Sequence, residues 1–284
     1  MTTNIPASVF ARLKNWAKAN GQDLQYVLFR YANERILYRL SISSERQGFV
    51  LKGATLFLAW NGRNHRVTRD IDLLGYGDPA PERLAELFRQ VAKVPCSEDG
   101  IFFDPTSIQV SPIREEMEYG GVRVTMRARL DRADLPVQID VGFGDVVRPV
   151  ETALPTILPL PAPQLRAYPR EVVVAEKLEA MVRLGRENTR LKDFYDIWLL
   201  LRSVQFDERL QQAIDATFAR RGTVTSSILP DALSDAFADD PVKQAQWVAF
   251  LRRAMTDEQP ALGEVIVVIR GALWPLLRPS KGTE

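Results

Sequence analysis

The sequence predicts an α+β protein, in which strands concentrate in the N-terminal half and helices fill the C-terminal half. Alternating apolar and polar residues predict strands over residues 107–113, 121–130 and 136–143, and Gly120-Gly121 predicts a turn between two of them. After residue 170, apolar residues recur at helical spacing, most clearly over residues 172–184 and 191–201. A chain of 284 residues is long enough for one large domain or two smaller ones.

The stretch between the two halves is rich in proline and shows little apolar periodicity. Its prolines are Pro149, Pro155, Pro159, Pro161, Pro163 and Pro169. Such a composition favours an extended connector. We therefore expect an N-terminal lobe over residues 1–150, a connector over residues 151–169 and a helical lobe over residues 170–284.

The elements ahead of these strands follow from the same patterns. Residues 6–41 predict two helices with a break at Asn20-Gly21, and residues 81–94 predict an amphipathic helix. Residues 49–60 form an apolar run that we interpret mainly as a helix, and residues 67–74 predict a strand. The basic side chains of the first segment are expected on a solvated outer surface: Arg12, Lys14, Lys18, Arg30, Arg35, Arg39 and Arg46.

Composition narrows the class of protein. The net charge of +1 provides no global attraction to nucleic acids or membranes, so any basic site must be a local patch. Cys96 is the only cysteine, which excludes an intrachain disulfide and favours a reducing compartment. The N-terminus lacks the apolar segment of a signal peptide, and no apolar run approaches about 18 residues. We therefore expect a cytoplasmic protein without a membrane span.

The chain has a single histidine, His65, within the polar stretch Asn61-Gly-Arg-Asn-His-Arg66. This excludes sites that need several histidines. It also disfavours a Ser-His-Asp site, since no apolar frame positions the imidazole. We expect His65 to be an exposed loop residue.

Three polar side chains alternate along the strand predicted over residues 67–74. Thr68, Asp70 and Asp72 are two residues apart, so their side chains point to one face of the strand. Two carboxylates about 6–7 Å apart along a strand can converge on one hard cation such as Mg²⁺ or Mn²⁺. Acids are also common at solvated strand ends, so the spacing alone leaves both interpretations open.

A further acid interrupts the strand predicted over residues 136–143. Val137, Ile139 and Val141 form its apolar face, and Asp140 lies on the opposite face with Gln138 and Gly142. A carboxylate within an apolar strand loses hydration unless a partner binds it. Asp140 is therefore a candidate third metal ligand, and an acid exposed at a strand edge is the alternative.

Upstream, Lys52-Gly53-Ala54-Thr55 can bring the backbone close to a ligand, since Gly53 has no side chain. A glycine turn followed by Asp70-Ile-Asp72 resembles the signature of polymerase-β-like nucleotidyltransferases, with Ala54 where glycine or serine is usual. Leu51-Lys-Gly-Ala-Thr-Leu56, followed by Arg66-Val-Thr-Arg-Asp-Ile-Asp-Leu-Leu74, is closer to one branch. It is similar to the AbiEii/MenT group of nucleotidyltransferase toxins.

The C-terminal half supports this resemblance with two more motifs. Glu176-Lys-Leu-Glu-Ala-Met-Val-Arg183 places a lysine on one helix, and Arg190-Leu-Lys-Asp-Phe-Tyr-Asp-Ile197 carries the later Arg-x-Lys-Asp-x-x-Asp motif. At about 100° per residue, Lys192, Asp193 and Asp196 fall within one arc of a helix. They form a compact charged edge beside the apolar stripe; an ordinary salt-bridged helix surface is the alternative.

The resemblance covers most of residues 6–205 and implies a nucleotidyltransferase fold, a sheet lobe with flanking helices plus a C-terminal helical lobe. It implies catalytic roles for Thr68, Asp70, Lys177 and Asp193, with Lys177 binding phosphate. Asp70, Asp72 and Asp140 are then the predicted metal ligands. We predict that the nucleotide contacts Lys52, Gly53, Ala54, Thr55, Arg66, Lys177, Lys192 and Asp196.

The same resemblance implies a function and partners. It predicts a metal-dependent transfer of a nucleoside monophosphate from an NTP to the 3′ end of tRNA, with pyrophosphate released. It also implies a toxin with a separately encoded antitoxin. A basic strand face at Arg123, Arg127 and Arg129 could meet RNA phosphates, or these arginines could pair with acids such as Glu115 and Glu116.

Two other functions remain open. The first is nucleotidyl transfer to a small molecule such as an aminoglycoside, for which the acids of residues 231–240 could supply an acceptor cleft. The second is a module that binds RNA or a partner without catalysis. The presence of Thr68, Asp70, Asp72, Lys177 and Asp193 argues against this second function.

Overall fold

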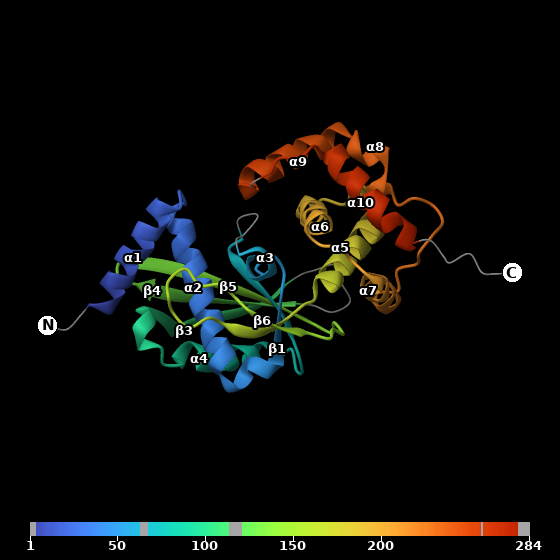
Figure 1. The fold of residues 1–284 in the computed structure, drawn as a ribbon. Helices are drawn as coiled ribbons and strands as arrows, with labels where there is room; N and C mark the ends of the chain where they lie inside the picture. Colours follow the sequence, from blue (N-terminus) through green and yellow to red (C-terminus); the bar gives the residue numbers. More distant parts are fainter. Residues whose placement is uncertain (1–3, 63–67, 114–120, 257, 278–284) are drawn as a thin grey trace. The chain divides into compact units, whose positions relative to one another are not determined.

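The computed structural model describes residues 4–62, 68–113, 121–256 and 258–277. The chain divides into two compact units, Met1–Tyr168 and Pro169–Glu284. The first unit contains the sheet and the second is helical (Figure 1). This confirms the predicted α+β class with a helical C-terminal part.

One mixed sheet forms the core of the N-terminal unit, with strand order β3-β4-β5-β2-β1-β7-β6. Its strands are β1 (Phe49–Lys52), β2 (Asp70–Gly75), β3 (Ile101–Ile113), β4 (Gly121–Leu130), β5 (Ala133–Phe143), β6 (Val150–Ala153) and β7 (Gln164–Ala167). Two neighbouring pairs, β2–β5 and β1–β7, run parallel, and the other pairs run antiparallel. The parallel β2–β5 pair positions the acids of the candidate site.

Helices pack against this sheet (Figure 1). They are α1 (Ile5–Ala19), α2 (Leu24–Ile42) and α4 (Pro81–Lys93), and a further short helix, α3 (Leu56–Asn61), follows β1. Asn4 and Asp23 cap α1 and α2 by accepting backbone N–H groups, as residues at these positions commonly do. One face of β4 and β5 is buried, because every second residue from Val122 to Leu130 and from Leu135 to Val141 is apolar. The opposite face holds polar side chains that are exposed or half-buried.

Most predicted elements are confirmed, with one helix corrected. Residues 49–60 form a strand and a short helix instead of mainly a helix. Phe49, Val50 and Leu51 are buried in the middle of the sheet. A short strand that is buried on both faces has no alternation, and its apolar run resembles a buried helix. The strand predicted over residues 107–113 begins earlier, at Ile101.

The proline-rich stretch contributes to the sheet. Strands β6 and β7 lie within or beside residues 151–169, and β7 pairs with β1 through Leu51 and Ala167. Buried charges hold the segment between these strands to α2: Glu34 accepts the Ile157 N–H at 2.8 Å, and Arg35 donates to the Pro161 carbonyl at 3.0 Å. Burial raises the pKa of Glu34 above its ordinary value.

The expected basic outer surface of the first two helices is wrong for Arg35 and Arg39. Both side chains are almost fully buried, and both contact the buried carboxylate of Asp99, Arg39 through its Nη1 at 2.6 Å. A buried cation needs such a partner to offset lost hydration. The partner lies far along the chain, in the 3₁₀ turn Ser97–Asp99, so helical spacing did not reveal it.

The C-terminal unit, where the structure describes it, contains helices and no strands. The helices are α5 (Arg170–Leu184), α6 (Leu191–Ser203), α7 (Glu208–Arg220), α8 (Asp235–Ala238), α9 (Pro241–Ala254) and α10 (Leu262–Leu277). Helices α5 and α6 confirm the predictions over residues 172–184 and 191–201. In the core of this unit, the rings of Phe194 on α6 and Phe237 on α8 are stacked, with centroids 5.4 Å apart. Of the helices that the structure describes, none combines the length and hydropathy that crossing a bilayer requires.

Candidate functional site

Three carboxylates meet on the open face of the sheet. Strands β2 and β5 are parallel neighbours, and their register places Asp72 opposite Asp140 and Asp70 opposite Gln138. Alternation along each strand directs Asp70, Asp72 and Asp140 to the same face. One oxygen from each lies within 4.8 Å of the others, and all three side chains are half-buried. The structure therefore brings together the three acids proposed from the sequence as metal ligands.

This group suits a hard divalent cation by its chemistry. All three donors are carboxylate oxygens, which Mg²⁺ and Mn²⁺ prefer. The farthest ligand oxygens around Mg²⁺ are about 4.2 Å apart, twice the metal–oxygen distance of about 2.1 Å. The observed upper limit of 4.8 Å is thus close to ligand spacing, and small side-chain movements would complete a site. The triad is consistent with a divalent metal site.

Neighbouring side chains hold two of these acids. The Thr68 hydroxyl donates to Asp70 Oδ1 at 2.8 Å, so the threonine of the predicted Thr-x-Asp motif contacts its aspartate directly. Arg123 forms a bidentate ion pair with Asp140: Nε donates to Oδ1 and Nη2 donates to Oδ2, each at 2.8 Å. The Gln138 amide oxygen accepts from the same guanidinium at 3.2 Å when the amide faces it. The bond to Asp140 raises the pKa of Arg123.

From the sequence, Arg123 is expected either to meet RNA phosphates or to pair with an acid such as Glu115 or Glu116, and its pairing with Asp140 is not predicted. The signal lies in the hairpin between β4 and β5. Its two-residue turn, Asp131-Arg132, has Asp131 at φ +52°, a conformation that aspartate tolerates better than most residues. Because the turn sets the register, counting back from it places Arg123 directly opposite Asp140.

The predicted glycine turn lies beside the acids. Lys52 is in register with Asp72, and its Nζ is 3.7 Å from an oxygen of Asp145. Gly53 has φ +74°, and a Cβ there would lie 1.9 Å from Asp72 Oδ2. Ala54 is buried, and Thr55 is the residue that precedes α3. Two further residues, His65 and Arg66, lie outside the described residues, as do Glu115 and Glu116.

Replacing Gly53 by alanine is expected to damage both stability and the site. A β-carbon at positive φ costs about 1–2 kcal/mol, and this one also collides with the Asp72 carboxylate. We expect the free energy of unfolding, measured in denaturant, to fall by at least about 2 kcal/mol. Nucleotidyl transfer should fall as well, because Asp72 has to move.

Gly62 provides the matched control for this substitution. It has nearly the same backbone, φ +71°, but a Cβ added at this position would meet open space, with nothing within 4 Å. Gly62→Ala therefore carries only the backbone strain, about 1–2 kcal/mol. Equal losses of stability and transfer in the two variants would show that the contact between Gly53 and Asp72 has no role.

A second charged cluster lies within the C-terminal unit. The Lys177 ammonium on α5 contacts Asp193 and, at 3.0 Å, Asp196, which are both buried on α6. Arg190 Nε donates to the second oxygen of Asp193 at 2.8 Å. Burial alone would raise the pKa of Asp193, but the charges of Lys177 and Arg190 outweigh it and lower this pKa below its ordinary value.

The predicted charged edge of this helix is thus corrected in part. Asp193 and Asp196 are buried together against α5, whereas Lys192 lies on the exposed side of α6. The alternative of an ordinary helix surface does not fit, because side chains at 1% and 0% exposure are not solvated. Two buried carboxylates require cationic partners, and Lys177 and Arg190 supply them.

The acids of residues 231–240 have ordinary structural roles. Asp240 caps α9 by accepting two backbone N–H groups, and its carboxylate lies 3.6 Å from Arg186. Asp235 pairs with Arg270 at 2.8 Å on the surface, and Asp231 and Asp239 are exposed. These contacts do not support the acceptor cleft that was considered for a small molecule.

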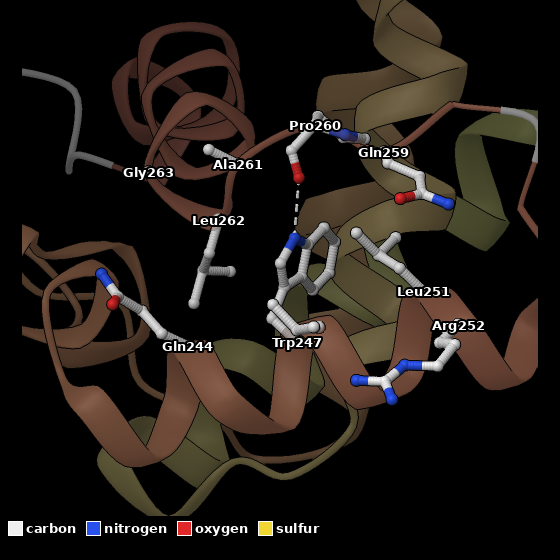
Figure 2. A pocket seen from close by; sticks show the side chains of 10 residues that line it. Gln244, Trp247, Leu251, Arg252, Gln259, Pro260, Ala261, Leu262 and Gly263 are labelled. Carbon is white, nitrogen blue, oxygen red and sulfur yellow. Dashed lines mark hydrogen bonds between the residues drawn. The ribbon is translucent and has the colours of Figure 1, made fainter.

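A groove of about 500 Å³ opens in the C-terminal unit between α9 and the start of α10 (Figure 2). Trp247 forms part of its wall, and the indole N–H donates to the Pro260 carbonyl at 2.8 Å. Of the described lining residues, only Arg252 is charged. None of the site residues predicted from the sequence lines this groove.

A mixed sheet that carries Asp70 and Asp72 on one strand, a third acid on the adjacent parallel strand and a glycine turn against the acids is the arrangement expected of a nucleotidyltransferase. The family model for the nucleotidyl transferase AbiEii toxin of type IV toxin–antitoxin systems matches residues 35–268, and the chain belongs to this family. The protein is therefore a nucleotidyltransferase toxin. Membership implies an NTP substrate and an antitoxin partner.

Two solved structures from Helicobacter pylori share the fold. One is JHP933, and the other is described provisionally as a nucleotidyltransferase. Each has 14% sequence identity and a TM-score of 0.51; the similarity covers 87% of this chain, 91% of the first and 92% of the second. At this identity, the likeness concerns the fold alone. No curated protein matches the chain by sequence.

Proposed function

We propose that this toxin transfers a nucleoside monophosphate from an NTP to the 3′ end of tRNA and releases pyrophosphate. The observation that carries the proposal is the group of three carboxylates whose oxygens lie within 4.8 Å of one another. Asp70, Asp72 and Asp140 would hold Mg²⁺ or Mn²⁺. When bound, such a cation supplies positive charge to the triphosphate and to the oxygens that attack and leave.

In the proposed reaction, the 3′-hydroxyl oxygen of the acceptor forms a bond to the α-phosphorus. The bond from this phosphorus to the bridging oxygen breaks, pyrophosphate leaves with that electron pair, and the proton of the attacking hydroxyl passes to solvent. Thr68 holds Asp70 in place through its 2.8 Å hydrogen bond, and the backbone at Gly53 lies close enough to Asp72 to exclude any side chain. These residues orient the carboxylates before substrate arrives, which lowers the cost of reorganisation.

Lys177 is the proposed phosphate-binding residue. An ammonium group is a compact charge that can face several phosphate oxygens. Asp193 and Asp196 contact this ammonium and are buried, so we assign them as positioning residues for Lys177. Both oxygens of Asp193 already accept from cations, which disfavours a role for this carboxylate as a general base.

The test is to incubate the protein with each labelled NTP in turn and deacylated tRNA, with Mg²⁺ or with a chelator. We expect label on the tRNA only when the metal is present and only with some of the four NTPs. Periodate-treated tRNA is the matched control, because its 3′-terminal diol is destroyed while the rest of the molecule is unchanged.

Equal labelling of treated and untreated tRNA would exclude the 3′ end as acceptor. If the protein is incubated with total RNA and another RNA is labelled, the proposed transfer reaction stands but its acceptor is that RNA and not tRNA. Label that enters only added aminoglycosides would establish the small-molecule function instead. Absence of any transfer with all four NTPs, under conditions where expression of the protein arrests growth, would contradict the proposed reaction.

A further inference from the structure

The Arg123 guanidinium is bound to one of the three acids of the candidate metal site. It lies on β4, directly opposite Asp140 on β5, and makes two 2.8 Å hydrogen bonds with that carboxylate. Paired donors of this kind form a planar fork on a carboxylate and are among the stronger ion pairs. The charges of Asp70 and Asp72 also act on Arg123 and favour its charged form.

Because of the strand order, Arg123 and a metal ion would act on the Asp140 carboxylate from opposite sides. Strand β5 lies between β4 and β2, so Asp140 has Arg123 on one side and Asp72 on the other. A cation bound to all three acids would draw Asp140 toward β2, whereas the guanidinium holds it toward β4. The three carboxylates carry three negative charges, of which Arg123 neutralises one through its ion pair with Asp140.

We propose that Arg123 is a built-in counter-ion that competes with the divalent cation for Asp140 and so lowers the affinity of the metal site. The inference rests on the metal site of the proposed function. The fork occupies hydrogen-bonding positions on both oxygens of Asp140, and its charge repels a cation placed beside it. The site then fills readily only when substrate phosphates add negative charge.

The position of Arg123 allows it to leave the carboxylate. Its side chain is 40% exposed on the open face of the sheet, so solvent can hydrate the guanidinium after release. A fully buried arginine, such as Arg35 in the same unit, has no such alternative.

The test measures binding of Mn²⁺ alone to the full chain, by the loss of the free-ion electron paramagnetic resonance signal. Arg123→Gln should bind Mn²⁺ about tenfold more tightly than the wild type, a change of about 1.4 kcal/mol. Without metal, its melting temperature should fall, because Asp140 then loses the cation that pairs with it. Addition of Mn²⁺ should raise that temperature more than in the wild type.

Arg127→Gln is the matched control, because Arg127 is exposed further along the same face of β4 and no described acid forms an ion pair with it. It should bind Mn²⁺ with the wild-type affinity. Arg123→Lys keeps the charge but loses the fork, so its affinity should lie between those of the wild type and Arg123→Gln. This conservative variant keeps the test available if Arg123→Gln does not fold.

Weaker Mn²⁺ binding by Arg123→Gln and Arg123→Lys would overturn the proposal, since Arg123 would then support Asp140 as a ligand. Unchanged binding in both would also overturn it. Failure of the metal site itself gives a different result: neither the wild type nor Arg123→Gln would bind Mn²⁺, and Asp72→Asn would leave the signal unaltered. The experiment therefore distinguishes failure of the counter-ion role of Arg123 from failure of the metal site.

Discussion

Asp70→Asn and Asp72→Asn are each expected to reduce nucleotidyl transfer by at least about a hundredfold, or about 2.7 kcal/mol of activation free energy. Asparagine keeps the shape of the side chain, and its oxygen at position 70 can still accept from the Thr68 hydroxyl. The substitution therefore removes charge from the carboxylate group with little change in packing. The measurement is the rate of NMP transfer to the acceptor at saturating Mg²⁺.

The same variants should be more stable than the wild type in the absence of metal. Three carboxylates with oxygens within 4.8 Å repel one another, so the loss of one charge should raise the melting temperature of the metal-free protein. Asp134→Asn is the control, because Asp134 is an exposed acid on the same face of β5. It should change neither transfer nor melting temperature appreciably.

Growth provides an independent readout of the same substitution. Expression of the wild type in a bacterium without the antitoxin should arrest growth, whereas Asp70→Asn at equal protein level should be harmless. If both proteins slow growth to the same extent, expression load is the cause and the metal site is not. Near-normal transfer by either asparagine variant in vitro would remove Asp70 or Asp72 from the metal site.

Lys177→Met is expected to have the second large effect, and it acts on stability as well as on transfer. The substitution removes the ammonium that contacts two buried carboxylates, Asp193 and Asp196. Removing one partner of a buried ion pair costs about 3–5 kcal/mol, because the remaining charge stays in a poorly solvating environment. The free energy of unfolding should fall by this amount, and NTP use should fall with it.

A double variant separates the two effects. In Lys177→Met/Asp193→Asn, one buried negative charge disappears together with the ammonium, so part of the lost stability should return. Transfer should not return, because the proposed phosphate-binding charge is still missing. Lys177→Arg should restore transfer only in part, since a planar guanidinium does not replace a compact ammonium.

Arg253→Met is the control for this series, because Arg253 is an exposed cation in the same unit. Its free energy of unfolding should stay within about 0.5 kcal/mol of the wild-type value. Wild-type transfer per folded molecule by the double variant would exclude a phosphate-binding role for Lys177. The cluster on α5 and α6 would then be structural only.

The sequence by itself determined the features that depend on local spacing. A strand places every second side chain on one face, so Asp70 and Asp72 had to point the same way once residues 70–75 were extended. The apolar residues of α5 and α6 recur at helical spacing, which located both helices within two residues of their observed ends. These features need no knowledge of which elements are neighbours.

The tertiary structure decided which residues meet and which are buried. The parallel pairing of β2 with β5 brings Asp140 to Asp72, and the register of the β4–β5 hairpin delivers Arg123 to the same carboxylate. Packing of α5 against α6 turns Asp193 and Asp196 from an apparent surface edge into a buried group that requires Lys177. Strand β1 resembles a helix in sequence because its consecutive residues Phe49, Val50 and Leu51 are all buried, so both of its faces are apolar. In each case the deciding free energy, of pairing or of burial, comes from contacts between segments far apart in the chain, which the spacing of residues within one segment cannot encode.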